Sequence, residues 1–140
     1  MATHPVFDLL LEGVDDGLER KVLRVLMQDA GRRVSRPMLV MQVFKVFVRP
    51  SELASCGKDR QIREAIERLQ GLGYPILASS GQAGYMLGGE EQQLDDYLVE
   101  LVSRKVRIEE KIGHLRVARK WMPFIREWIA DRAVVQARLF

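Results

Sequence analysis

Apolar residues recur three or four positions apart in five stretches of the chain, and this spacing is typical of amphipathic helices. The five stretches cover residues 6–12, 17–30, 37–46, 59–72 and 90–121. The fourth is the most regular, because Ile62, Ala65, Ile66 and Leu69 all fall on one side of a helix. Pro123 follows the fifth stretch and predicts a break there, after which Phe124, Trp128 and Val135 predict a shorter terminal helix.

Two short apolar runs break the helical pattern and indicate a β-hairpin. Residues 74–78 and 85–87 predict two strands, and glycines between them suit a tight turn. A further extended piece is expected at 32–35, between the first two main helices.

This order of elements predicts a mainly α fold with three segments. We expect a lead-in segment at 1–15, a domain of three helices and a hairpin at 16–89, and a helical region at 90–140. The last region should contain a long helix and a short terminal helix.

The composition excludes several classes of function. No apolar run reaches the 18 or more residues that a membrane span requires, and the first residues lack the pattern of a secretory signal, so we expect a cytoplasmic protein that does not bind membranes. The single cysteine, Cys56, and two distant histidines cannot form a zinc site. No catalytic constellation or phosphate-binding loop is present, so we expect neither an enzyme nor a bound cofactor or metal.

Positive charge is concentrated in one part of the chain. The whole sequence carries a net charge of +3, whereas residues 31–69 contain nine basic and four acidic residues, an excess of five. This distribution favours a polyanionic partner for that segment.

The most regular helix and the hairpin together carry a family resemblance. The run Asp59-Arg60-Gln61-Ile62-Arg63-Glu64-Ala65-Ile66-Glu67-Arg68-Leu69, followed by Leu72-Gly73-Tyr74 and later Gly84-Tyr85-Met86-Leu87, resembles winged helix-turn-helix domains of bacterial and phage regulators. The amino-terminal domain of the biotin ligase repressors is one such relative. The resemblance implies a β-hairpin wing and binding of double-stranded DNA by the helix at 59–72.

The outer face of that helix supplies candidate DNA contacts. Long polar side chains near its start can bond base edges in the major groove, and we expect this role for Arg60, Gln61, Arg63 and Glu64. Phosphate contacts are expected from Arg68, Lys58 and Lys45, and from a second basic cluster at Arg32, Arg33 and Arg36. The wing residues Ser79, Ser80 and Gln82 are expected to bond either phosphate or edges of the minor groove. The alternatives are ordinary surface ion pairs and solvated connectors, and Glu64 and Glu67 also fit an adaptor that binds a protein of the replication or transcription machinery.

The long helix at 90–121 has the heptad spacing of a coiled coil. Its seam contains Leu94, Leu98, Leu101, Ile108, Ile112 and Leu115, interrupted by Lys105 and Arg119. We expect this seam to form a homodimer, while packing on its own domain is the alternative. Like charges in the seam disfavour a parallel pair. The complete prediction is a dimeric transcriptional regulator that binds a pseudo-palindromic DNA site.

Overall fold

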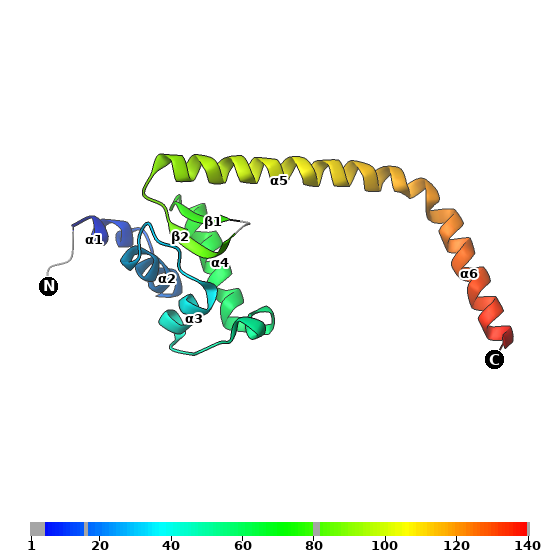
Figure 1. Ribbon diagram of the computed structural model, residues 1–140, viewed down its shortest axis with the longest axis horizontal. Helices are drawn as coiled ribbons and strands as arrows, with labels where there is room; N and C mark the ends of the chain where they lie inside the picture. Colours follow the sequence, from blue (N-terminus) through cyan, green and yellow to red (C-terminus); the bar gives the residue numbers. More distant parts are fainter. Residues whose placement is uncertain (1–4, 16, 80–81, 140) are drawn as a thin grey trace. The chain divides into compact units, whose positions relative to one another are not determined.

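The computed structural model describes residues 5–15, 17–79 and 82–139. The chain is mainly helical, with one two-stranded antiparallel hairpin and a long carboxyl-terminal helix, as the sequence predicts (Figure 1). Its contacts divide it into two units, Met1–Leu98 and Val99–Phe140, and each is described by itself. The elements of the first unit before the long helix are α1 (Pro5–Glu12), α2 (Gly17–Gln28), α3 (Arg36–Phe44), the 3-10 helix η1 (Pro50–Ser55), α4 (Gly57–Gly71), β1 (Ile76–Ser79) and β2 (Gln82–Leu87).

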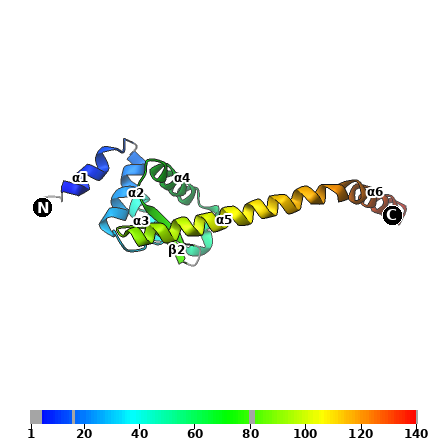
Figure 2. The ribbon, with the colours of Figure 1, turned by 90° about the horizontal axis from the view of Figure 1, so that it is seen from above.

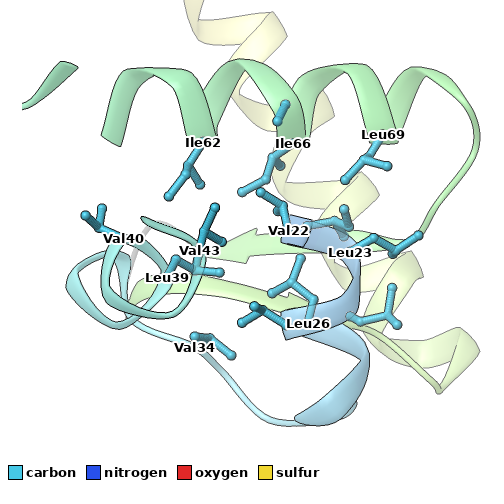
Figure 3. Close-up of a cluster of buried hydrophobic side chains, with 14 of the residues drawn as sticks. Val22, Leu23, Leu26, Val34, Leu39, Val40, Val43, Ile62, Ile66 and Leu69 are labelled. Carbon is cyan, nitrogen blue, oxygen red and sulfur yellow. The ribbon is translucent and has the colours of Figure 1, made fainter. Parts of the chain in front are cut away.

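The core of the first unit lies where α2, α3 and α4 meet. These three helices lie together in both views of the ribbon (Figures 1 and 2). Figure 3 shows Ile62, Ile66 and Leu69 of α4 pointing toward apolar side chains of α2 and α3. The apolar positions that predicted the helix at 59–72 most clearly, Ile62, Ala65, Ile66 and Leu69, are buried, because α4 places its apolar stripe against α2 and α3. The labelled partners are Val22, Leu23, Leu26, Val34, Leu39, Val40 and Val43.

Local sequence sets the two ends of α3. The Ser35 hydroxyl accepts a hydrogen bond from the backbone N–H of Met38 at 3.3 Å, and Pro37 lies in the first turn, where no intrahelical N–H bond is required. The helix ends at Lys45, whose φ of 59° is left-handed and whose N–H bonds the Met41 carbonyl at 2.8 Å. The helix expected at 37–46 therefore begins one residue earlier, at Arg36, and ends two residues earlier, at Phe44.

A third extended segment pairs with the hairpin along β2. In β1 and β2, Ile76 lies opposite Leu87 and Ala78 opposite Tyr85, with an irregularity between Ala78 and Ser79. Val34 forms an antiparallel bridge with Tyr85, and the two residues exchange backbone hydrogen bonds of 2.7 and 2.9 Å. The extended piece expected at 32–35 thus lies beside the hairpin.

Other sequence expectations for this unit need small corrections. The helix expected at 17–30 ends at Gln28, and the helix expected at 59–72 runs from Gly57 to Gly71. The segment between α3 and α4 contains the 3-10 helix η1. Strand β2 begins three residues earlier than expected, because residues of the predicted turn pair with β1. The tip residues 80 and 81 lie outside the described part of the chain.

The lead-in helix α1 is attached to the rest of the first unit. Leu11 and Val14 are buried in its core. The hydroxyl of Tyr74, just after α4, donates a hydrogen bond of 2.5 Å to the Leu10 carbonyl. The segment expected to precede the domain therefore contributes to its core.

The long helix α5 (Glu91–Ala118) begins in the first unit and continues in the second. The 3-10 helix η2 (Arg119–Trp121) and the helix α6 (Met122–Leu139) follow it. The expected helix end at 121 is corrected to Ala118, and Pro123 lies in the first turn of α6 rather than between helices. Proline is accepted in a first turn but clashes with the carbonyl four residues earlier, so the regular helix ends about one turn before it.

Candidate nucleic-acid interface

Helix α4 presents one apolar face to the core and one polar face outward. Ile62, Ala65, Ile66 and Leu69 are at most 2% exposed. The four expected base contacts Arg60, Gln61, Arg63 and Glu64 are all exposed. The polar face therefore has long side chains with hydrogen-bonding ends that are accessible along the first half of the helix.

A buried carboxylate lies at the amino-terminal end of α4 between two arginines. Asp59 is 1% exposed and accepts two hydrogen bonds from Arg36, at 3.1 Å from Nε and 2.5 Å from Nη2. The Nε atom of Arg63, one turn further along α4, lies 3.2 Å from the same carboxylate. The hydrogen bond with Asp59 raises the pKa of the Arg36 guanidinium. The cluster of Arg36, Asp59 and Arg63 has a net charge of +1, and it fixes both arginines beside the start of α4.

A second ion pair links the far end of α4 to α2. Arg68 donates to the carboxylate of Glu19, which is 4% exposed. Arg68 itself is half exposed. The structure therefore gives this expected phosphate contact a role in joining two helices of the core.

The remaining basic candidates lie around α3 and the start of α4. Lys58 is exposed, and its Nζ lies 5.9 Å from the centre of the Phe44 ring, within the range of a cation–π interaction. Lys45 is exposed at the left-handed end of α3. Arg32 is exposed, whereas the Arg33 guanidinium approaches the Gly84 carbonyl of β2 at 3.4 Å. Arg32 and Arg33 thus precede the strand-like residue Val34, while Arg36 belongs to the cluster with Asp59.

The wing candidates are described only in part. Ser80 lies outside the described residues. Ser79 ends β1 and Gln82 begins β2, so their backbones lie at the end of the hairpin near its turn.

The expected dimerisation residues share one face of α5. Leu94, Leu98, Leu101, Ile108, Ile112 and Leu115 are between 38% and 63% exposed. Within the described residues of this chain, no element covers these side chains sufficiently to bury them.

Sequence reasoning missed the structural part of this surface. Asp59 is not among the residues that the sequence predicts for the DNA surface, although a helical projection places it about 60° from Ile62, on the buried side. An acidic residue on that side is a recognisable indication of a buried ion pair. The pairing of Glu19 with Arg68 had no such indication, because 49 positions separate the two residues.

Tyr85 also lies near the Arg36–Asp59–Arg63 cluster. Burial raises the pKa of its phenol above the ordinary value of 10.0, and the charge of Arg36 opposes this shift. The hairpin therefore places a neutral hydroxyl close to the charged cluster.

Comparison with known proteins identifies no relative: no family model, no curated protein and no solved structure matches the chain. Among the described helices, none combines the length and the apolar character needed to cross a membrane. The arguments for function therefore come from the geometry of the first unit.

Proposed function

We propose that the first unit is a winged helix-turn-helix domain that binds double-stranded DNA by placing α4 in the major groove. The order α2, Val34, α3, α4 and hairpin supports this proposal, because it is the order of elements in such domains. The packing also supports it, since α4 uses one face for the core and leaves the other accessible. A helix with an accessible polar face fits the width of the major groove.

The observation that carries the proposal is the exposed row of Arg60, Gln61 and Glu64 beside a fixed pair of arginines. Arginine can donate two hydrogen bonds to guanine, and glutamine can bond adenine in the same way. In the part of the chain that the structure describes, the Arg60 guanidinium has no ion-pair partner. Its donors are therefore accessible to a base or a phosphate.

The Arg36–Asp59–Arg63 cluster supports phosphate binding at the start of α4. The first N–H groups of a helix have no partner in the helix, and they carry a partial positive charge. Arg36 and Arg63 are partly exposed, and the cluster that they form with Asp59 adds a net charge of +1 at this place. A phosphate of the DNA backbone is attracted to the helix N-terminus and to the two arginines. Because Asp59 already holds the Arg36 and Arg63 side chains in place, these side chains lose less conformational freedom on binding.

The test is duplex binding by a variant in which Arg60→Ala and Gln61→Ala are combined. A duplex is first selected from a random library with the unmodified protein, and its affinity is then measured at several salt concentrations. Because a base contact contributes about 1–3 kcal/mol, the double variant should bind at least about tenfold more weakly. The slope with salt should also decrease, if Arg60 contacts a phosphate.

The matched control is Arg24→Ala, which removes one exposed arginine from α2 and leaves α4 unchanged. It should keep the affinity of the unmodified protein within about twofold. Unchanged binding by the Arg60→Ala, Gln61→Ala variant would overturn the placement of α4 in the groove.

A second candidate function is an adaptor that binds another protein. Glu64 and Glu67 are both exposed on α4, and two carboxylates are unusual on a surface that approaches phosphates. Duplex binding by the unmodified protein and by Glu67→Gln distinguishes the two functions. If Glu67→Gln binds the selected duplex more tightly than the unmodified protein does, the result supports DNA recognition. If the unmodified protein binds no duplex, the result supports the adaptor.

A further inference from the structure

Helix α5 presents an apolar face that requires a partner. The six seam residues, Leu94, Leu98, Leu101, Ile108, Ile112 and Leu115, repeat with alternating steps of four and three, except where Lys105 replaces an apolar residue. An exposed apolar stripe of this length is typical of an interaction surface, and the alternation of three and four is typical of helix pairs. A second copy of this chain provides a helix with the same repeat.

We propose that α5 pairs with α5 of a second copy in the antiparallel orientation. This inference goes beyond the proposed function, because self-association is independent of DNA. Two observations distinguish the antiparallel from the parallel arrangement: the position of Lys105 in the seam and the distribution of charge along the helix.

Lys105 disfavours a parallel pair. In that arrangement each seam residue faces its own counterpart, so two Lys105 ammonium groups would meet in the core of the pair. In an antiparallel pair that places Leu98 opposite Leu115, Lys105 faces Ile108 of the second copy. Its aliphatic stem can then cover apolar surface while its Nζ stays near Glu109 of its own helix, 3.9 Å away.

The two halves of α5 carry opposite charge. Residues 91–100 contain four acidic residues and no basic one, whereas residues 101–118 contain five basic and two acidic residues. A parallel pair places like halves side by side, and an antiparallel pair places the acidic half of each helix along the basic half of the other. Charge complementarity therefore favours the antiparallel orientation.

The register that places Lys105 opposite Ile108 also pairs four other seam residues with one another. Leu98 then faces Leu115 of the second copy, and Leu101 faces Ile112. Beside the seam, Asp95 lies next to Arg116 of the second copy. One neighbouring pair is unfavourable, because Arg104 approaches Lys111, but Arg104 is already bonded to Glu100 of its own helix at 2.6 Å.

The first measurement is the oligomeric state of the full chain by analytical ultracentrifugation at micromolar concentration. We expect a dimer that Leu101→Asp dissociates. Ser103→Asp adds the same charge on the opposite face of α5 and should leave the dimer intact. A monomeric unmodified chain, or a dimer that persists in Leu101→Asp, would overturn the proposal.

The orientation is tested by cross-linking in a Cys56→Ser background, which removes the native thiol. Chains with Leu98→Cys and chains with Leu115→Cys are treated with a short bifunctional thiol reagent, alone and mixed. The antiparallel pair gives cross-linked product mainly in the mixture, because residue 98 faces residue 115. Product from each variant alone and none specific to the mixture would establish the parallel pair and overturn the proposal.

Charge exchange provides an independent test of orientation. In the antiparallel pair, Asp95→Arg and Arg116→Asp each place like charges together and should weaken dimerisation roughly fivefold, and the two changes combined should restore it. In a parallel pair, Asp95 and Arg116 each lie beside a like charge, Glu90 and Lys111 respectively. Each single change would then strengthen the dimer, and this result would contradict the proposal.

Discussion

Arg36 at the start of α3 donates two hydrogen bonds to Asp59 at the start of α4, at 3.1 and 2.5 Å. Because Asp59 is almost completely buried, Arg36 and Arg63 stabilise its negative charge, as water would do at an exposed position. The same contact joins two helices of the core and fixes an arginine at the candidate DNA surface. Asp59 therefore links the packing of the core to the position of Arg36 on the proposed DNA surface.

Asp59→Ala should destabilise the protein by about 2–4 kcal/mol, since it leaves two neighbouring arginines without their shared partner. Loss of a negative charge in the first turn of α4 adds to this effect. Denaturant unfolding followed by circular dichroism measures the change. Glu64→Ala, an exposed acidic position on the same helix, is the control and should change the free energy of unfolding by less than about 0.5 kcal/mol. Equal effects of the two substitutions would contradict a structural role for Asp59.

The phenol of Tyr85 should make stability depend on alkaline pH. Burial raises the pKa of Tyr85 in the folded chain above its ordinary value of 10.0. The folded state therefore binds more protons than the unfolded state above about pH 10, and this contribution is complete below that pH and is lost as the pH rises through the folded pKa.

The measurement compares the unmodified protein with Tyr85→Phe between about pH 8 and pH 11. The unmodified protein should lose stability relative to Tyr85→Phe as the pH rises above about 10. The two proteins differ only in this hydroxyl, so the difference between the two curves isolates the phenol. A difference that stays constant over this range would show that Tyr85 does not contribute.

Periodicity was sufficient to predict the buried side of α4. Ile62, Ile66 and Leu69 are separated by three or four positions, and the structure buries all three against α2 and α3. This prediction succeeded because the spacing of apolar residues along one helix already determines which face the helix buries. The bounds were less accurate, since they depend on caps such as the left-handed Lys45.

The ion pairs of the candidate site could not be predicted in the same way. Arg36, Arg63 and Arg68 were expected to contact DNA because of their charge, but their partners Asp59 and Glu19 are identified only by the fold. A sequence gives the charge of an arginine and not the distance to a carboxylate on another helix. Their contacts with DNA remain predictions.

Gly84 should be intolerant of any side chain. Its φ of 99° is in the region that glycine adopts most readily, and an added Cβ would collide with the Val34 carbonyl that Tyr85 N–H bonds. Gly84→Ala should therefore cost at least about 2 kcal/mol of unfolding free energy, as strain and overpacking combine.

Two other glycines separate these effects. Gly73 has a similar φ of 96° with open space around it, so Gly73→Ala should show the strain alone, at about 1 kcal/mol. Gly113 lies inside α5, five residues before its end, with open space and a φ outside the left-handed region, and Gly113→Ala should stabilise that helix by up to about 1 kcal/mol. If Gly84→Ala lowers the free energy of unfolding no more than Gly73→Ala does, the close approach of Val34 does not contribute to the intolerance of Gly84.

Lys45 offers a substitution that should stabilise the protein. It ends α3 with a φ of 59°, a conformation that costs a residue with a side chain about 1–2 kcal/mol, whereas glycine adopts it freely. Glycine also gains more freedom in the unfolded chain, so the net stabilisation by Lys45→Gly should be about 0.5–1 kcal/mol. Lys45→Ala removes the same charge and keeps the strain, and it should therefore be less stable than Lys45→Gly by about 1 kcal/mol. Thermal unfolding of the two variants measures this difference directly, and equal stabilities would mean that the left-handed end of α3 relaxes when lysine is replaced.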